Sequence, residues 1–411
     1  MIAASAAADW PVGSACSRNL SINRVNPLQR QLVSTMAKKQ QQGEMPRVPE
    51  FPASLFAWPA LMAASVGEAF AASLGAPPAP AETAAARPVW TTPHRMRLEI
   101  GTMELRDFST GERGVPVLIC APFALHCATI ADFARGHSVV AALRESGVDR
   151  IHVTDWRSAE PDMRFLSIDN YLADLNVAVD EIGGPVDLIG LCQGGWMALT
   201  YAARFPHKVR RLVLAGAPVD IGAGQSNLSQ MTIQIPLAAF EEFVGSQGGR
   251  VLGQRVLQIW GTALIADDAR RVLQLPLDDD SKEMLELEAR FREWYDLTVD
   301  LPGAYYLQVV SWLYQQNRLA TGNFVALGRR IDLSALRHPI FLLGARDDEI
   351  VAPGQLFATA SRVGTPREEI ETAMESCGHL ALFLGAGTIR KTWPRIARWL
   401  GDGTRVASED A

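Results

Sequence analysis

From about residue 97, short apolar runs alternate along the chain with longer amphipathic stretches. Residues 96–108 alternate apolar and polar positions like a half-buried β-hairpin, whereas residues 167–183 open with a Ser/Asp cap and carry apolar residues at helical spacing. Short continuous apolar runs between turns are typical of strands buried on both faces of a sheet. Five runs fit this description: VPVLIC (115–120), RIHVTDW (150–156), VDLIGL (186–191), VRRLVLAGA (209–217) and PIFLLGA (339–345). The pattern predicts an α/β fold with a mostly parallel central sheet and helices on both faces.

Residues 220–330 interrupt this alternation. They are rich in Trp, Leu, Gln and Arg and show helical patterning, so we predict an inserted helical cap there. The apolar residues of 51–75 either pack on the core or contact an apolar partner. The predicted organisation is a flexible N-terminal region (1–50), a short helical segment with a Pro/Ala-rich linker (51–95), the first part of the core (96–219), the cap (220–330), the second part of the core (331–402) and a flexible tail (403–411).

The composition narrows the possible functions. The 411 residues are 48% hydrophobic and 20% charged, as in folded soluble proteins, and the net charge of -6 offers no basic surface for nucleic acid. Five cysteines without a CxxC pair argue against a disulfide scaffold, and the histidines show no metal-ligand spacing, so we expect neither metal nor cofactor. We find no signal peptide and no membrane span, and predict a cytoplasmic protein of undetermined oligomeric state.

The segment with the clearest chemistry is VDLIGLCQGGWMALTYAARFP (186–206). A buried strand runs through Gly190-Leu191-Cys192-Gln193-Gly194-Gly195 directly into an amphipathic helix, which is a nucleophile elbow with cysteine in the usual serine position. The glycines are needed because a Cβ at position 190 or 194 would collide with the neighbouring helix and strand. The helix N-terminus also favours negative charge on sulfur. We therefore predict Cys192 as a catalytic nucleophile.

A cysteine nucleophile needs a base, and in this type of sheet the base is a histidine that follows the last strand. Three histidines follow the elbow: His207, His338 and His379. His207 ends the elbow helix and His338 precedes a strand, so both lie at the wrong edge of the sheet. His379 lies in a turn after the expected last strand and is the predicted base.

The carboxylate that orients the base should follow the penultimate strand. LLGARDDEIVAP (342–353) supplies two neighbouring candidates there, Asp347 and Asp348. Both cannot serve the same imidazole. We prefer Asp348, with Asp347 as a solvated or capping neighbour.

Backbone N–H groups beside the nucleophile are expected to form the oxyanion hole. One comes from Gln193, which follows the nucleophile, and the other from Phe123 or Ala124 in the loop after the first buried strand. His126, in the same loop, either orients substrate or makes only local hydrogen bonds. Trp196, on the elbow helix, is a further candidate for binding substrate.

These motifs resemble the polyhydroxyalkanoate-processing α/β-hydrolases, which comprise intracellular depolymerases and polymer synthases. The resemblance covers roughly residues 95–400. GLCQGG (190–195) is similar to the synthase box G-x-C-x-G-G. ARDDEIV (345–351) aligns without a gap with the synthase acid motif, and this alignment places the acid at Asp348. Cys-Gly-His379 matches the histidine motif of both branches.

Other stretches are more similar to the depolymerases, although depolymerases of this branch usually lack the paired glycines of the elbow. The depolymerase-like stretches are APFALHCAT (121–129), TDW (154–156), YDLTVDLPGAYYLQVV (295–310) and GARDDEIVAPGQ (344–355). The resemblance implies a covalent acyl-enzyme on a 3-hydroxyacyl ester, with polymer or oligomers at a granule surface as the partner. We predict an intracellular poly(3-hydroxybutyrate) depolymerase. The alternatives are a synthase that uses coenzyme A thioesters and, from another class, a non-catalytic granule-associated protein.

Overall fold

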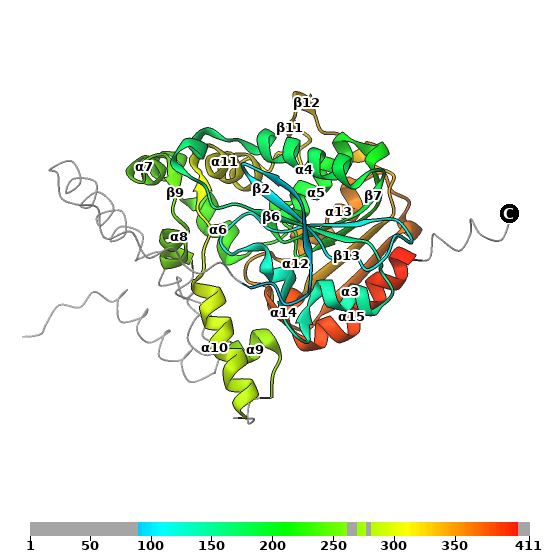
Figure 1. The fold of residues 1–411 in the computed structure, drawn as a ribbon. Helices are drawn as coiled ribbons and strands as arrows, with labels where there is room; N and C mark the ends of the chain where they lie inside the picture. Colours follow the sequence, from blue (N-terminus) through cyan, green and yellow to red (C-terminus); the bar gives the residue numbers. More distant parts are fainter. Residues whose placement is uncertain (1–88, 261–268, 277–280, 402–411) are drawn as a thin grey trace, which may run out of the picture. The chain divides into compact units, whose positions relative to one another are not determined.

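The computed structural model describes residues 89–260, 269–276 and 281–401, which form the coloured ribbon of Figure 1. The predictions for 1–50, for 51–88 and for 403–411 lie outside these residues. The main sheet has eight strands in the order β1-β2-β6-β3-β7-β8-β13-β14. Their bounds are β1 Arg95–Ile100, β2 Met103–Asp107, β3 Val117–Cys120, β6 Ile151–Trp156, β7 Val186–Leu191, β8 Val209–Ala215, β13 Ile340–Ala345 and β14 Ile370–Glu375.

The sheet is mostly parallel. β1 and β2 form the predicted antiparallel hairpin, and β2 also pairs antiparallel with β6, whereas every neighbouring pair from β6 to β14 is parallel. Every residue of β7 and β13 is buried. This burial on both faces explains why these strands are continuous apolar runs and not alternating ones. The predicted α/β class is therefore confirmed.

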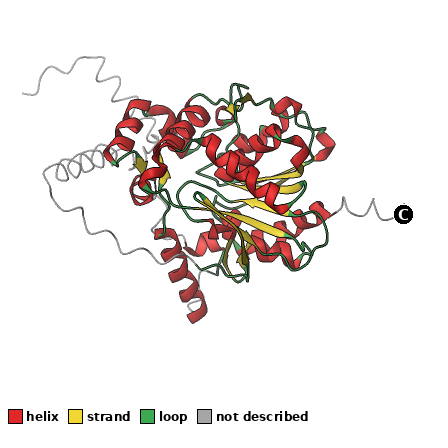
Figure 2. Ribbon diagram, turned by 45° about the horizontal axis from the view of Figure 1, so that its top comes forward, coloured by secondary structure: helices red, strands yellow, loops and turns green. Residues whose placement is uncertain are grey.

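Helices cover both faces of the sheet (Figure 2). α3 packs against α15 on one side, and α4 packs against α5 on the other (Figure 1). The helices of the core are α3 Val139–Glu145, α4 Ile168–Ile182, α5 Gln193–Arg204, α12 Pro353–Phe357, α13 Thr359–Arg362, α14 Ala381–Leu384 and α15 Ala386–Gly401. The core also contains the short strands β4 Asp132–Ala134 and β5 His137–Ser138, and the 3₁₀ turns η1 Ala128–Ala131, η2 Pro161–Phe165, η3 Pro206–Lys208, η6 Leu333–Ala335 and η7 Arg367–Glu369.

Local sequence signals set the ends of α4. The backbone N–H of Ser167 donates to Asn170 Oδ1 at 2.8 Å, and the helix ends at Gly183 with φ of 83°. A side chain satisfying a free backbone group at the start and a left-handed glycine at the end are the usual helix limits. Among the described residues, no helix is long and apolar enough to cross a membrane.

Between β8 and β13 the chain leaves the sheet and forms a group of helices, where the cap was predicted. Its elements are η4 Ile221–Ala223, α6 Asn227–Gln234, α7 Leu237–Ser246, β9 Arg250–Val251, α8 Gly253–Trp260, α9 Ala269–Leu273, α10 Lys282–Asp296, β10 Leu301–Pro302, α11 Gly303–Gln308, the π-helix η5 Val309–Gln315, β11 Val325–Ala326 and β12 Arg329–Arg330. β9 pairs with β10, and β11 pairs with β12, both antiparallel.

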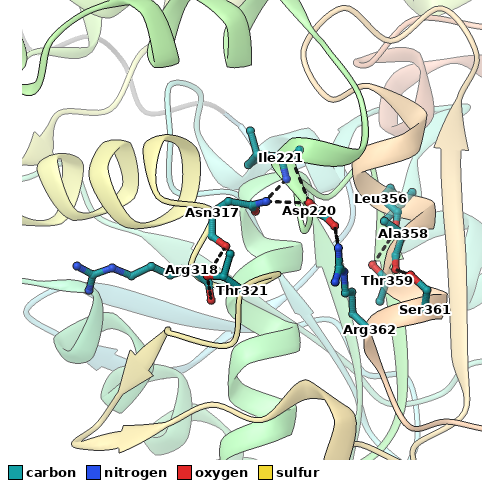
Figure 3. A network of polar contacts seen from close by, with 11 residues as sticks. Asp220, Ile221, Asn317, Arg318, Thr321, Leu356, Ala358, Thr359, Ser361 and Arg362 are labelled. Atoms are coloured by element: carbon teal, nitrogen blue, oxygen red, sulfur yellow. Dashed lines mark hydrogen bonds and ion pairs between the residues drawn. The ribbon is translucent and has the colours of Figure 1, made fainter.

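One buried carboxylate joins the two ends of this cap to the core (Figure 3). Asp220, where the cap begins, accepts hydrogen bonds from Asn317 Nδ2 at 2.8 Å and from Arg362 Nη2 on α13 at 2.6 Å. Burial raises the pKa of Asp220, but the bonds from Asn317 and Arg362 outweigh it and lower the pKa below its ordinary value. We call Asp220, Asn317 and Arg362 the cap clamp.

Candidate active site

The turn between β7 and α5 holds Cys192 in a strained conformation. Cys192 has φ of 49° and ψ of −119°, and its N–H donates to Ala215 O of the neighbouring strand at 2.8 Å. Such a backbone costs about 1–3 kcal/mol and persists where the surroundings fix it. A Cβ on Gly190 would overlap the backbone of the facing helix, and one on Gly194 would overlap the carbonyl oxygen of Cys120 at the end of β3. The glycines therefore allow the close contacts that hold the sulfur at the carboxyl edge of the sheet.

A carboxylate and an imidazole meet at the same edge of the sheet. His379 Nδ1 lies 2.7 Å from Asp348 Oδ2, and both side chains are buried. The other oxygen, Asp348 Oδ1, accepts from the backbone N–H groups of Ile350 at 2.9 Å and Val351 at 2.8 Å. Asp347 is exposed. The structure thus places Asp348, and not Asp347, against the imidazole.

The second ring nitrogen of His379 is available for chemistry. Nε2 is buried and has no hydrogen-bond partner within the described ranges. Burial lowers the pKa of His379, but the charge of Asp348 and the neighbouring Cys192 outweigh it and raise the pKa well above its ordinary value. A Cβ on Gly216 would lie 3.0 Å from Cε1 of the ring, so this glycine leaves room for the imidazole. The structure thus brings together Cys192, His379 and Asp348 in the order that proton transfer needs.

Cys192 and His379 open into one cavity of about 240 Å³. The cap supplies most of the opposite wall, and most of the lining is apolar or aromatic. The lining residues from the cap are Asn227, Leu228, Met231, Thr232, Val256, Tyr295, Leu301, Tyr305, Tyr306, Val309, Val310 and Tyr314. None of the described lining residues is a lysine or an arginine. The cavity therefore has a mainly apolar wall, with Glu349 as a charged residue in its lining.

The residues expected to form the oxyanion hole lie beside the sulfur. As the first residue of α5, Gln193 has a backbone N–H without an intrahelical partner. Phe123 and Ala124 line the same cavity from the loop after β3, and neither N–H makes a backbone hydrogen bond in the described part of the chain. Tyr305 donates from its hydroxyl to Phe123 O at 3.2 Å, which attaches this loop to the cap. The structure leaves both Phe123 and Ala124 as candidates for the second donor.

The two predicted substrate-binding residues have different positions. His126 lines the cavity and stacks on Trp294 and Tyr295, with ring centroids 4.6 and 4.7 Å away. Burial lowers the pKa of His126 to about 4, although a hydrogen bond from the ring to the backbone carbonyl of Leu297 acts in the opposite direction, so the ring is neutral. Trp196 does not line the cavity. It is fully buried, and its ring lies next to that of Phe324, with ring centroids 6.0 Å apart.

Two polar contacts that hold the side chain of Gln193 are not predicted from the sequence. Trp196 Nε1 donates to Gln193 Oε1 at 2.7 Å, and Gln193 Nε2 donates to the hydroxyl of Tyr314 at 2.8 Å. Tyr314 lies in η5, 121 residues away along the chain. No local pattern could identify such a partner, although an irregular helical turn is often found at functional sites.

The other described cysteines have the properties of packing residues. Burial raises the pKa of Cys120 to about 12, and it raises those of Cys127 and Cys377 to about 11. All three are buried, and none lines the cavity, whereas Cys192 is partly accessible and does line it. Among the described cysteines, Cys192 alone is therefore both partly accessible and open to the cavity.

Comparison with known proteins agrees with this architecture. Residues 132–386 match the family model described as alpha/beta hydrolase fold. The chain is 29% identical to the poly(3-hydroxyalkanoate) polymerase subunit PhaC of Synechocystis sp., over 71% of this chain and 79% of that protein. It is 27% identical to the protein of the same name from Allochromatium vinosum, over 66% and 76%, and 25% identical to that from Haloferax mediterranei, over 80% and 68%. The resemblance to polyhydroxyalkanoate-processing proteins is therefore confirmed, and the chain belongs to the α/β hydrolase fold family.

Proposed function

We propose that this protein is a polyhydroxyalkanoate synthase that transfers 3-hydroxyacyl groups from coenzyme A thioesters to a growing polyester through Cys192. The observation that carries the proposal is the convergence of Cys192, His379 and Asp348 at one apolar cavity, in a chain whose relatives are named as polymerase subunits. Those relatives support the synthase better than the depolymerase that the sequence predicts, since the three compared above all carry the polymerase name.

In the first half-reaction the acyl group moves to the enzyme. The sulfur of Cys192 attacks the thioester carbonyl carbon while Nε2 of His379 takes the thiol proton. The N–H of Gln193 and one N–H from Phe123 or Ala124 stabilise the oxyanion. The bond from the carbonyl carbon to the coenzyme A sulfur then breaks, and this sulfur leaves with the proton from the imidazolium.

In the second half-reaction the acyl group moves to an alcohol. The acceptor hydroxyl gives its proton to His379 Nε2 as its oxygen attacks the acyl-Cys192 carbonyl. The carbon–sulfur bond breaks, the proton returns to the sulfur, and a new ester is formed. Throughout both halves Asp348 holds the imidazole with its proton on Nδ1, which leaves Nε2 free to accept.

The cavity supports acyl transfer more than it supports binding of a whole coenzyme A. Its volume of about 240 Å³ lies below the usual range of small-molecule pockets, and its described lining contains no lysine or arginine for phosphates. The acyl chain would therefore occupy the cavity while the nucleotide stays outside. An apolar wall that excludes water also favours an alcohol acceptor over hydrolysis.

Two substrates offered side by side test the proposal. The purified protein is mixed in parallel with 3-hydroxybutyryl-CoA and with amorphous polymer granules. We expect release of coenzyme A with formation of insoluble polyester, and no 3-hydroxybutyrate from the granules. The relatives are named as subunits, so sustained polymerisation could need a second subunit, whereas acylation of Cys192 needs this chain alone. The primary readout is therefore the first turnover, seen as a burst of coenzyme A equal to the enzyme concentration.

Other outcomes would assign the rival functions. Release of 3-hydroxybutyrate from granules without the coenzyme A burst would identify the depolymerase of the sequence prediction. Failure of both reactions, together with failure of a thiol reagent to label Cys192 in a substrate-protected manner, would leave the granule-associated protein. The variant Cys192→Ala is the matched control for each reaction.

A further inference from the structure

Tyr314 brings a hydroxyl group from the cap to the nucleophile. It lies in the π-helix η5, it is nearly fully buried, and it lines the cavity together with Cys192 and His379. π-helical turns are rare and are frequently found at functional sites. The mechanism above assigns no role to this group.

The directions of two hydrogen bonds determine what the hydroxyl can do. An indole N–H can only donate, so Trp196 fixes Oε1 of Gln193 as the acceptor at 2.7 Å. The amide nitrogen of Gln193 must then face Tyr314, and it donates to the hydroxyl oxygen at 2.8 Å. Tyr314 is therefore an acceptor in this bond, and its own proton points elsewhere.

The proton of Tyr314 has no acceptor in the part of the chain that the structure describes. Burial raises the pKa of Tyr314, and the nearby charge of Cys192 raises it further against the bond from Gln193, so the phenol stays protonated at neutral pH. A buried donor without an acceptor is costly, and the surrounding cavity wall is mainly apolar. The missing acceptor is thus best supplied by a polar atom of the bound substrate.

A 3-hydroxyacyl group has two oxygen atoms near the reacting carbon. The carbonyl oxygen has its donors in the backbone N–H groups of Gln193 and of Phe123 or Ala124. The hydroxyl on the third carbon has no partner among these groups. We propose that Tyr314 donates its hydroxyl proton to the 3-hydroxyl oxygen of the acyl group and so selects 3-hydroxyacyl over unsubstituted acyl substrates.

This inference rests on the proposed function, but its test does not need polymer or coenzyme A. The p-nitrophenyl esters of 3-hydroxybutyrate and of butyrate differ by the one hydroxyl, and each releases p-nitrophenol when it acylates Cys192. The ratio of their first-turnover rates is measured in the full-length wild type, in Tyr314→Phe and in Tyr201→Phe. Tyr201 is the matched control, because it is a buried tyrosine that does not line the cavity. Its hydroxyl donates to Asn176 Oδ1 at 3.1 Å.

We expect the wild type to favour the 3-hydroxybutyrate ester and Tyr314→Phe to lose this preference by about tenfold, the effect of one neutral hydrogen bond. Tyr201→Phe should keep the wild-type ratio. Loss of the acceptor for Gln193 slows both esters in Tyr314→Phe, which is why the ratio is the readout. An unchanged ratio, even with both rates reduced, would overturn the proposal, as would a wild type without preference. A synthase assay that fails while the ratio falls would refute the proposed function alone.

Discussion

Replacing Asp348 by asparagine keeps the size of the side chain and removes its charge. In the structure Oδ1 of Asp348 accepts from the N–H groups of Ile350 and Val351, so this position must remain an oxygen in the variant. The amide nitrogen of Asn then takes the place of Oδ2, which lies 2.7 Å from Nδ1 of His379 in the wild type. Nδ1 therefore faces a hydrogen-bond donor in the variant. His379 responds by accepting at Nδ1 and carrying its proton on Nε2. In that tautomer it cannot take the proton from Cys192.

The magnitude follows from this loss of the base. Removing the orienting carboxylate of a nucleophile–histidine–acid triad, with the wrong tautomer as the result, costs about 10⁴-fold in rate in a serine protease. We expect Asp348→Asn to slow acylation of Cys192 by about 10³- to 10⁴-fold, which corresponds to roughly 4–5.5 kcal/mol of lost transition-state stabilisation. The fold should survive, because both backbone N–H groups keep an oxygen acceptor.

The assay is the first-turnover release of p-nitrophenol from the 3-hydroxybutyrate ester, with thermal unfolding as the check on folding. Asp347→Asn is the matched control, since Asp347 is the exposed neighbour of the same residue type. It should stay within about twofold of the wild type. The reasoning fails if Asp348→Asn retains more than a tenth of the wild-type rate, or if the two variants lose equal activity.

Three further predictions use the same site. Cys192→Ala should abolish turnover and leave the unfolding transition close to that of the wild type, while Cys192→Ser keeps a small residual rate; turnover by the alanine variant would exclude the nucleophile. Gly194→Ala should lower the free energy of unfolding by about 3 kcal/mol in urea titration, because its Cβ would overlap a backbone carbonyl, whereas Gly101→Ala, with open space at its Cβ, should be nearly neutral. In ¹³C NMR the imidazole of His379 should titrate above about pH 6.5 in the wild type and lower in Asp348→Asn, since burial is then no longer opposed by that charge; an unchanged midpoint would contradict the assigned cause.

The sequence was sufficient for the fold and for much of the site because both depend on local patterns. A strand that passes through small residues directly into a helix allows only one position for the sulfur of Cys192, which is the edge of the sheet. The position of His379 follows from the same rule, since the ends of parallel strands meet at one edge. The choice between Asp347 and Asp348 was harder, because neighbouring residues in a turn point in different directions and only the coordinates show which one is buried.

The remaining features depend on contacts that are distant in sequence. A tryptophan on an amphipathic helix suits a core or a pocket equally well, and only packing shows that Trp196 is buried outside the cavity. The bond from Gln193 to Tyr314 depends on how the cap sits over the core, which periodicity does not encode. The direction of the reaction is likewise beyond local patterns, because synthesis and hydrolysis share the same acyl-enzyme.

The cap clamp also sets rules for building chimeras. Asp220 receives hydrogen bonds from Asn317 in the returning chain and from Arg362 in the core. If the cap were exchanged together with Asp220, the guanidinium of Arg362 would lose its carboxylate partner. A splice placed between Asp220 and its partners would leave a charge buried without its counterion, which destabilises a protein by several kcal/mol. Exchange boundaries are therefore better placed within β8 and beyond α13, so that donor and acceptor travel as one unit.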